Sequence, residues 1–421
     1  MAGVRAGGVM KKCLLFVGGG VETLPGVRLA RAMGLEVAVS DGNAASPCLA
    51  EADYPLLAST YDPAGTVAAA RAFARDHRPI DGVLCLAVDV PHTVAAVAAA
   101  LGLPGISPET ARLAMDKLAM KARLAADGIP VPFFAAVTGP DDLRAAVDRH
   151  GPDLVLKPVD SRGARGVQRL ARVADLDAAY AEARRHSPTG RVMVERFLPG
   201  PQVSTESLVL SGVAHTPGFS DRNYEFLDRF APFIIENGGE LPSVLPGDAQ
   251  DAVRALVDRA AASLGVRQGV VKGDIVVSGG KPYVIELATR LSGGYFCSHE
   301  IPSSTGVDFL GAAIRLCLGE AVSPGELVPA FSRGVAQRWI FADPGEIVSI
   351  DGVEAARDVP GVFYLELRAR PGDVVAPINC HPARLGVVMA AAPSREAAVA
   401  AAEAAVAAII VTTRPTDACH A

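Results

Sequence analysis

The first hundred residues alternate short apolar runs with longer amphipathic segments, and this alternation limits the possible folds more than any other feature of the sequence. The pattern predicts strands at 13–17, 36–40 and 82–87, and helices at 21–33, 63–77 and 91–101. Strands that alternate with helices in this way form a parallel sheet with helices on both faces. The sequence therefore predicts an α/β domain at its N-terminal end.

Three glycines, 18–20, follow the first predicted strand, and Asp41 ends the second about twenty residues later. This spacing resembles a dinucleotide-binding turn, but the third glycine of G-x-G-x-x-G would fall on Thr23. A glycine turn still lets backbone amides approach a ligand closely. A nicotinamide-dependent oxidoreductase is kept as an alternative.

Length, charge and cysteine content indicate the number of domains, the kinds of partner and the cellular compartment to expect. At 421 residues the chain is too long for one compact core, so we expect two or three domains. The formal net charge of −6 disfavours nucleic acid and anionic membrane as partners, and no apolar run reaches membrane-spanning length. Seven cysteines are scattered singly, Cys419 among them, which suits free thiols in a reducing compartment. We expect a cytoplasmic protein without a secretory signal.

The segment 270–294 carries the clearest chemistry. Two β-rich runs flank a hairpin-turn signal at 278–281, so Asp274 and Glu286 would lie on neighbouring strands. Two carboxylates held together repel each other unless a cation lies between them, and such oxygen pairs suit Mg²⁺ carried on a nucleotide phosphate. Arg290 can grip a phosphate or carboxylate in bidentate fashion. The alternative is an ordinary hairpin with solvated charges.

A strand-borne lysine stands directly before a second notable segment. The apolar run 154–158 contains Lys157, and the segment 159–167 adds two glycines, a serine and two arginines. Glycines admit backbone amides to phosphate oxygens, and cations offset the charge that develops during phosphoryl transfer. The order differs from the G-x-x-x-x-G-K-[ST] of a P-loop, so an exposed turn without a ligand is the alternative.

One helix is predicted over 109–127, before a break at 128–130. It carries Lys117 and Lys121, which stand at i and i+4 and so share a face. By itself this spacing is most often found on a solvated face.

Four separated features occur in one order: Met115-Asp116-Lys117, Leu156-Lys157-Pro158 with its loop, Glu195-Arg196-Phe197-Leu198-Pro199-Gly200, and Asp274 with Glu286-Leu287-Ala288-Thr289-Arg290. This series resembles the ATP-grasp superfamily over most of the chain, in particular its carboxylate–amine and amino-acid ligases, near the purine-biosynthetic and biotin-carboxylase-like members. The resemblance implies an α/β (α+β) fold in three parts. These are a parallel pre-ATP-grasp domain at 1–111, a two-subdomain ATP-grasp fold at 112–330 with a lid at about 125–198, and a small β-rich domain at 331–421.

The resemblance also implies a site for ATP and Mg²⁺. Asp274 and Glu286 would hold the metal, while Arg290 and Lys157 would act in catalysis. The implied nucleotide contacts are Lys117, Lys157, Ser161, Arg162, Gly163, Gly166, Glu195, Phe197, Leu198 and Gln202. The implied substrate contacts are Arg222, Tyr224, Glu236, Arg290, Ser292 and Gly293, with a role as surface loop residues as the alternative for the first three.

The activity implied by the resemblance is that of an ADP-forming ligase. It would join a small carboxylate to an amine through an acyl-phosphate, with an amino acid as one substrate, and it would form a homodimer. An ATP-dependent carboxylase or formyl-transfer enzyme of the purine type is one alternative, and a non-catalytic nucleotide-binding protein is another. Gln202 replaces an acid that often binds ribose in the family, and Ala288 replaces a frequent Asn ligand of the metal.

Overall fold

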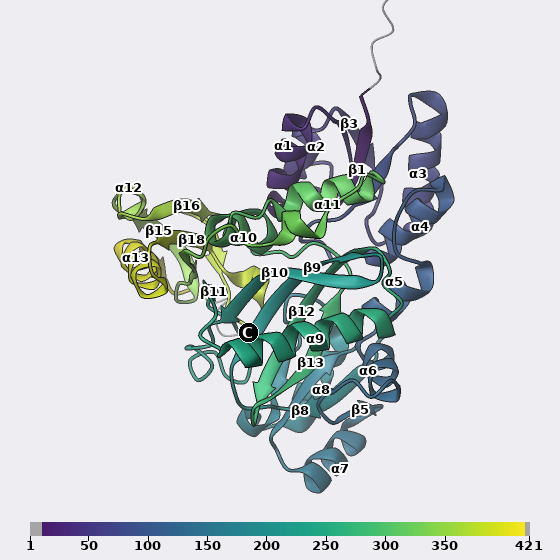
Figure 1. Cartoon of the computed structure of the whole chain (residues 1–421). Helices are drawn as coiled ribbons and strands as arrows, with labels where there is room; N and C mark the ends of the chain where they lie inside the picture. The colour runs from purple at the N-terminus through teal and green to yellow at the C-terminus, as the bar shows by residue number, and fades with distance from the viewer. Residues whose placement is uncertain (1–10, 417–421) are drawn as a thin grey trace, which may run out of the picture.

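The computed structural model describes residues 11–416 (Figure 1). Its N-terminal part is a parallel sheet in the order β3-β2-β1-β4, with helices on both sides, as the alternation predicts. β1 is buried along its whole length, which is why its sequence is a continuous apolar run. The elements are β1 (Cys13–Val17), η1 (Val21–Thr23), α1 (Leu24–Ala32), β2 (Glu36–Asp41), α2 (Pro47–Glu51), β3 (Tyr54–Leu57), α3 (Pro63–Asp76), β4 (Gly82–Leu84) and α4 (Pro91–Leu101).

The glycine turn after β1 is held by neighbours within its own domain. The Asp41 carboxylate accepts hydrogen bonds from the Gly19 amide at 2.8 Å and from the Ser46 hydroxyl at 3.0 Å. Gly18 has a φ of +101°, and a Cβ there would stand 2.5 Å from the side chain of Val88. Only glycine fits this position. The Asp41 carboxylate is used to hold the glycine turn through the Gly19 amide.

The helix predicted over 109–127 is in fact two helices, α5 (Pro108–Met115) and α6 (Lys117–Ala126), so the prediction of one continuous helix was wrong. Asp116 separates them because its backbone is extended, with φ −114° and ψ 101°. Its carboxylate accepts a hydrogen bond from the Ala119 amide at 2.8 Å and thereby caps α6.

A small antiparallel sheet follows, in the order β5-β8-β6-β7. Leu143 and Ala183, from its two α-helices, pack with Leu154, Leu156 and Val194 of the strands in one core. The elements are β5 (Phe134–Val137), α7 (Pro140–His150), β6 (Leu154–Pro158), β7 (Gln168–Arg169), η2 (Leu170–Arg172), α8 (Leu176–Arg185) and β8 (Val192–Arg196).

The centre of the molecule is an eight-stranded antiparallel sheet in the order β13-β12-β9-β10-β11-β14-β18-β16. The predicted hairpin forms β12 and β13, and Gly279 and Gly280 both adopt positive φ in its turn. The elements of this region are β9 (Gln202–Leu210), β10 (Val213–Arg222), β11 (Gly239–Leu241), α9 (Gly247–Ser263), β12 (Gly269–Ser278), β13 (Lys281–Ala288), η3 (Phe296–Glu300), α10 (Ile301–Thr305), α11 (Phe309–Cys317) and η4 (Pro324–Leu327).

The C-terminal segment is rich in strands, and three of them continue the central sheet. A separate sheet has the order β17-β15-β19. The elements are β14 (Gly334–Ile340), β15 (Gly345–Asp351), α12 (Val353–Arg357), β16 (Val362–Leu367), β17 (Val374–Val375), η5 (His381–Ala383), β18 (Gly386–Ala392), α13 (Arg395–Ala408) and β19 (Ile410–Arg414). Together the three regions confirm the predicted mixed α/β class.

One hydrophobic core joins the N-terminal sheet to the central sheet. It contains Phe16 of β1, Phe309 and Ile314 of α11, and Val335 of β14. The Ala87 amide also donates to the Leu291 carbonyl at 3.1 Å, just past β13. These contacts fix the carboxyl ends of the N-terminal strands over the central sheet.

Within residues 11–416, no helix is long and apolar enough to cross a membrane. In the same range, the six cysteines are free thiols: Cys13, Cys48, Cys85, Cys297, Cys317 and Cys380. Cys419 lies outside the described residues.

Candidate active site

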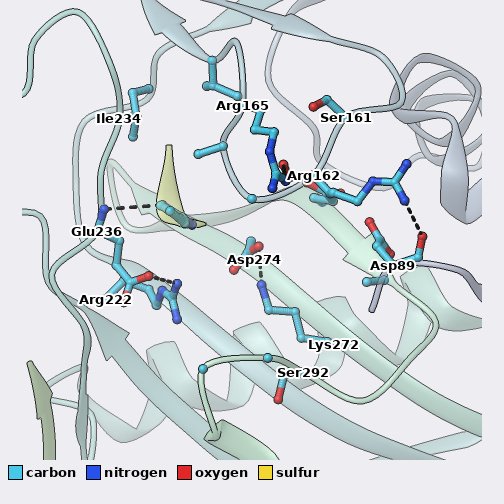
Figure 2. Close-up of a pocket in the computed structure, with 18 of the residues that line it drawn as sticks. Asp89, Ser161, Arg162, Arg165, Arg222, Ile234, Glu236, Lys272, Asp274 and Ser292 are labelled. Atoms are coloured by element: carbon cyan, nitrogen blue, oxygen red, sulfur yellow. Dashed lines mark hydrogen bonds and ion pairs between the residues drawn. The ribbon is translucent and has the colours of Figure 1, made fainter. Parts of the chain in front are cut away.

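A cavity of about 630 Å³ is lined by residues of the N-terminal, small and central regions and of the C-terminal segment (Figure 2). Of the predicted site residues, its wall contains Lys117, Lys157, Ser161, Arg162, Gly163, Glu195, Phe197, Leu198, Gln202, Arg222, Tyr224, Glu236, Asp274, Glu286, Arg290, Ser292 and Gly293. Gly166 is not part of the wall. It belongs to the loop at 161–167 but packs against Pro158 and His186, since a Cβ there would stand 3.1 Å from each.

The hairpin brings the two predicted metal carboxylates together. Asp274 on β12 is paired in register with Glu286 on β13. Each carboxylate has a lysine partner: Lys272 pairs with Asp274, and Lys117 Nζ lies 3.0 Å from a Glu286 oxygen. Burial acts to raise the pKa of Asp274, but Lys272 and Arg222 outweigh it and lower that pKa to about 2.

These carboxylates suit a hard divalent cation. Oxygen donors are the ligands that Mg²⁺ prefers, and Mg²⁺ commonly takes one or two carboxylates together with substrate phosphates and water. The described residues hold no cluster of three or more His, Cys, Asp or Glu side chains around a potential metal position. A two-carboxylate site completed by phosphate oxygens therefore fits the donor set better than an all-protein cage.

Glu195 lies between two buried lysines. Its carboxylate is 2.5 Å from Lys157 Nζ and 2.8 Å from Lys121 Nζ. Lys121 is only 1% exposed, so in this structure the i, i+4 spacing of Lys117 and Lys121 does not mark a solvated face. Burial and the neighbouring Lys157 lower the pKa of Lys121 to about 8, although Glu195 opposes this. Lys157 also lines the cavity, where its charge can face a phosphate.

The loop over 161–167 covers one side of the cavity (Figure 2). Lys117 Nζ donates to the Ser161 carbonyl at 2.7 Å. Arg162 reaches the N-terminal domain: its Nη1 donates to the Asp89 carbonyl at 3.3 Å, and its guanidinium lies 4.2 Å from the centre of the Tyr61 ring. The loop is thus closed against its neighbours in this structure.

Asp89 is a site residue that the sequence analysis missed. Its carboxylate lies 3.5 Å from Arg290 Nε, and both side chains line the cavity. Burial acts to lower the pKa of Arg290, but Asp89 raises it above its ordinary value. Asp89 follows β4 at the carboxyl edge of the parallel sheet, which is where such sheets bind ligands, and that position was the available signal.

Apolar side chains line another part of the cavity. Val155, Phe197, Leu198, Val276 and Ile285 contribute there, together with the amide of Gln202. The Arg169 guanidinium lies 4.1 Å from the centre of the Phe197 ring. A flat aromatic base could lie between these apolar side chains, with Gln202 available to a hydroxyl group.

Arg222 and Glu236 form an ion pair with each other (Figure 2). Arg384, which the sequence analysis missed, also contacts Glu236, with its Nη2 at 3.0 Å. The backbone amide of Glu236 donates to His381 Nε2 at 3.5 Å. Burial lowers the pKa of His381 well below its ordinary value, and the nearby arginines lower it further. This end of the cavity therefore holds two guanidinium groups around one carboxylate.

The turn after Arg290 is held from three directions. The Ser292 amide donates to Glu206 at 2.9 Å, the Gly294 amide donates to Glu22 at 2.7 Å, and Gln337 Nε2 donates to the Gly294 carbonyl at 2.5 Å. Glu22, Glu206 and Gln337 belong to regions far apart in the sequence. They were missed because no local pattern connects them.

His299 packs against aromatic rings, as a structural histidine would. Its ring centre is 5.2 Å from that of Tyr295 and 4.7 Å from that of Tyr364.

Two family models match the chain: an ATP-grasp domain over residues 114–294 and an L-amino acid ligase C-terminal domain 2 over residues 338–414. A D-alanine--D-alanine ligase of Gloeobacter violaceus is 31% identical over 223 residues, covering 50% of this chain and 70% of that ligase. The chain belongs to the ATP-grasp superfamily. As a member it is an ADP-forming ligase. Enzymes of this superfamily generally use ATP and Mg²⁺.

Another relative, the uncharacterized protein y4rH of Sinorhizobium fredii, is 28% identical over 360 residues, covering 82% of this chain and 67% of that protein. The chain thus spans about two thirds of the length of these curated relatives.

Solved structures share the ATP-grasp fold of this chain. The L-amino acid ligase of Bacillus licheniformis superposes with a TM-score of 0.80 at 23% identity, covering 96% of this chain and 99% of that one. The biotin carboxylase domain dimer of the Hydrogenobacter thermophilus 2-oxoglutarate carboxylase, in complex with MgADP and bicarbonate, superposes with a TM-score of 0.72 at 18% identity, covering 96% and 92%.

Proposed function

We propose that this ATP-grasp enzyme joins a small carboxylic acid to an amine through an acyl-phosphate, with an amino acid as one substrate. The proposal depends mainly on the set of side chains that line one cavity. It combines a carboxylate pair for a metal, a glycine- and arginine-containing loop with two lysines for phosphate, and a separate cationic end lined by Arg222 and Arg384. The matched L-amino acid ligase domain at 338–414 supports the same substrate class.

The proposed nucleotide site uses the apolar wall for the base and the lysine-rich region for the phosphates. Phe197, Leu198 and Gln202 would contact the nucleoside, while Lys117 and Lys157 would contact phosphate oxygens. Asp274 and Glu286 would hold Mg²⁺, which neutralises phosphate charge when bound. In this structure Lys272 pairs with Asp274 and Lys117 pairs with Glu286. A bound cation would take the place of these ammonium groups, and each lysine could then contact a substrate oxygen.

The residues of the chain suit acyl-phosphate chemistry. The substrate carboxylate attacks the γ-phosphorus, ADP leaves, and the amine then attacks the acyl carbon and expels phosphate. Such steps need positioning and charge neutralisation more than a covalent nucleophile. Arg290 and Lys157 are cationic side chains that can neutralise this charge, so no Ser or Cys nucleophile is required. A closed loop at 161–167 would keep water away from the acyl-phosphate. Asp89 would orient Arg290 through their ion pair.

Gln202 and Ala288 do not argue against this assignment. Gln202 lines the cavity, where its amide can hydrogen-bond a ribose hydroxyl. Ala288 supplies no oxygen, so water or phosphate would complete the metal coordination.

We also propose the three-part organisation with boundaries near residues 111 and 330, a lid at about 125–198, and a homodimer. The biotin carboxylase domain that shares the fold is a dimer, and this supports the proposed dimer. Light scattering on the purified protein measures its mass in solution and so tests the proposed dimer.

The test of the proposed function is phosphate release from Mg-ATP. The purified protein is assayed against an array of amino acids and other small carboxylates, each with and without amines, beside a Glu286→Ala variant. We expect release that requires one acid and one amine and falls at least about a hundredfold in the variant. Release with bicarbonate or formate alone would instead assign a carboxylase or formyl-transfer activity.

A further inference from the structure

Glu206 lies beside the turn that follows Arg290 and is not part of the cavity wall. It is a residue of β9 and is 0% exposed. One of its carboxyl oxygens accepts the Ser292 amide at 2.9 Å, whereas the other, Oε2, is buried without a hydrogen bond. A buried carboxylate with an unpaired oxygen is costly, so this position favours a carboxyl that keeps its proton.

No lysine or arginine forms an ion pair with Glu206 in the part of the chain that the structure describes. Lys272 is opposite Glu206 in the register of β9 and β12, but it pairs with Asp274 instead. On the other side, β10 presents Gly218, where a Cβ would stand 2.9 Å from the Glu206 side chain. The strands on both sides of β9 therefore bring no cation that pairs with this carboxyl.

The other charged and titratable groups that face Glu206 are Arg290 in the turn and Cys297 and Glu300 of η3. Burial raises the pKa of Cys297 well above its ordinary value and raises that of Glu300 to about 8. Burial also raises the pKa of Glu206 to about 7, although Ser292 and Arg290 oppose this. Both the geometry and the surroundings of Glu206 thus favour a neutral acid at slightly acidic pH.

Asp89, in contrast, is an anion beside the same arginine. Its carboxylate lies 3.5 Å from Arg290 Nε. Burial acts to raise the pKa of Asp89, but Arg290 and Lys117 outweigh it and lower that pKa. Two carboxyl groups near Arg290 therefore differ in charge because their surroundings differ. A second anion at Glu206 would compete with a bound phosphate or acyl-phosphate for the guanidinium group.

We propose that Glu206 is a positioning residue that acts as a neutral acid: it holds the turn through Ser292 and leaves the charge of Arg290 to the ligand. The Ser292 hydroxyl is buried without a hydrogen bond and is available to the proton on Oε2, so Ser292 is held at two points. Figure 2 shows this hydroxyl directed away from Ser161 and Arg162. The inference rests on the proposed role of Arg290 in the ligase reaction and adds a residue outside the cavity wall.

The charge of Glu206 is measured without turnover. Infrared difference spectra between the wild type and Glu206→Gln isolate the band of this residue, because a protonated carboxyl and a carboxylate absorb at different frequencies. We expect the protonated band at about pH 6 and the carboxylate band at about pH 9, on either side of the pKa of about 7. Glu354→Gln, which changes an exposed partner of Arg357, gives the reference spectrum of an ionised surface carboxyl.

Kinetics test the positioning role. Glu206→Gln preserves a neutral group that can accept the Ser292 amide and donate to the Ser292 hydroxyl, whereas Glu206→Leu removes both contacts. At about pH 6 we expect Glu206→Gln to keep kcat within about threefold of the wild type and Glu206→Leu to lower it about a hundredfold. Calorimetry should give both variants the wild-type affinity for a non-hydrolysable ATP analogue, because Glu206 does not line the cavity.

The pH profile separates a neutral acid from a residue that only fills space. The neutral fraction of Glu206 falls as pH rises through about 7. Between about pH 6 and about pH 8, kcat of the wild type should therefore fall about tenfold more than kcat of Glu206→Gln. A residue that only fills space would give parallel profiles.

Three outcomes would overturn the inference: a carboxylate band already present at about pH 6, a loss of kcat in Glu206→Gln as large as in Glu206→Leu, or parallel pH profiles. If Glu206→Leu does not fold, the spectra and the profile of Glu206→Gln decide. An absence of turnover by the wild type with every acid and amine would remove the ligase proposal, and the infrared spectra would still decide whether Glu206 is neutral.

Discussion

At the scale of single residues, the buried carboxyl groups of the site differ in charge because their neighbours differ. Burial acts to raise the pKa of Glu195, but Lys121 and Lys157 outweigh it and the pKa is lowered. Glu300 is 3% exposed, and no lysine in the described part of the chain pairs with it, so burial raises its pKa to about 8 although Arg222 opposes this. The same side-chain chemistry therefore gives an anion at one position and a largely neutral acid at the other near neutral pH.

Glu300 leads to a prediction about stability and pH. A carboxyl whose pKa is higher in the folded state than its ordinary 4.5 stabilises the fold below that value, and this contribution is lost as pH rises through about 8. We therefore expect the free energy of unfolding of the wild type to fall relative to Glu300→Gln as pH rises from about 5 to about 8.5. Urea unfolding of both proteins at these two pH values measures the difference.

The groups that face Glu300 are Arg222, Glu236 and Glu206. Glu206 is itself a raised-pKa acid, at about 7, but it is present in both proteins and largely cancels in the comparison. Glu354→Gln, on exposed helix α12, serves as the control. Parallel pH curves for wild type and Glu300→Gln would contradict the prediction.

At the scale of elements, the break between α5 and α6 positions Lys117, which we propose contacts phosphate oxygens. Asp116 caps α6, and its other oxygen lies 2.5 Å from Arg191. Lys117 is the next residue, and its ammonium reaches both the Ser161 carbonyl and Glu286. Because α6 begins at this point, the lysine is directed toward the cavity.

Removing the cap should affect both stability and nucleotide binding. We expect Asp116→Ala to lower the free energy of unfolding by about 1 kcal/mol, the usual cost of a lost N-cap. We also expect KM for ATP to rise about fivefold because Lys117 is less well oriented. Urea unfolding and initial-rate kinetics measure these effects. Asp116→Asn keeps a capping oxygen and should retain most of the stability; an Ala variant with unchanged stability and KM would show that the cap does not position Lys117.

At the scale of the whole molecule, Glu22 connects three regions of the chain. It comes from η1 of the N-terminal domain, accepts the Gly294 amide next to the central sheet, and pairs at 2.8 Å with Arg368, which follows β16. A Cβ on Gly293 would stand 2.8 Å from a Glu22 oxygen, so the turn and this carboxylate are closely packed. The part of the cavity beside Gly293 is therefore shaped by residues that only the assembled molecule brings together.

Substitution of Glu22 should separate substrate binding from nucleotide binding. We expect Glu22→Ala to raise KM for the acid or the amine about tenfold, since a charge-assisted contact is lost, while KM for ATP stays nearly constant. Steady-state kinetics with each substrate varied in turn measures this. Glu51→Gln, in an exposed pair with Arg28, is the control. An equal rise in KM for ATP would mean that Glu22 stabilises the whole cavity and not the substrate turn.

The sequence by itself determined the class of fold and predicted many of the residues that line the candidate cavity, because both depend on short-range patterns. Strand and helix periods, the glycine turn of the β12–β13 hairpin, and the order of lysine, loop and carboxylate motifs can all be read within a few residues. Asp274 and Glu286 were predictable as neighbours because a hairpin sets its own register.

Only the tertiary structure decided which charges meet. Lys121 is a buried partner of Glu195, Asp89 faces Arg290, and Arg384 contacts Glu236, although the members of these three pairs are separated by 74 to 201 positions. Burial and long-range pairing set the charge of each group, and neither can be read from residue type and spacing. The physical reason is that a charge in a low-dielectric cavity is governed by the nearest opposite charge in space, whatever its position in the chain.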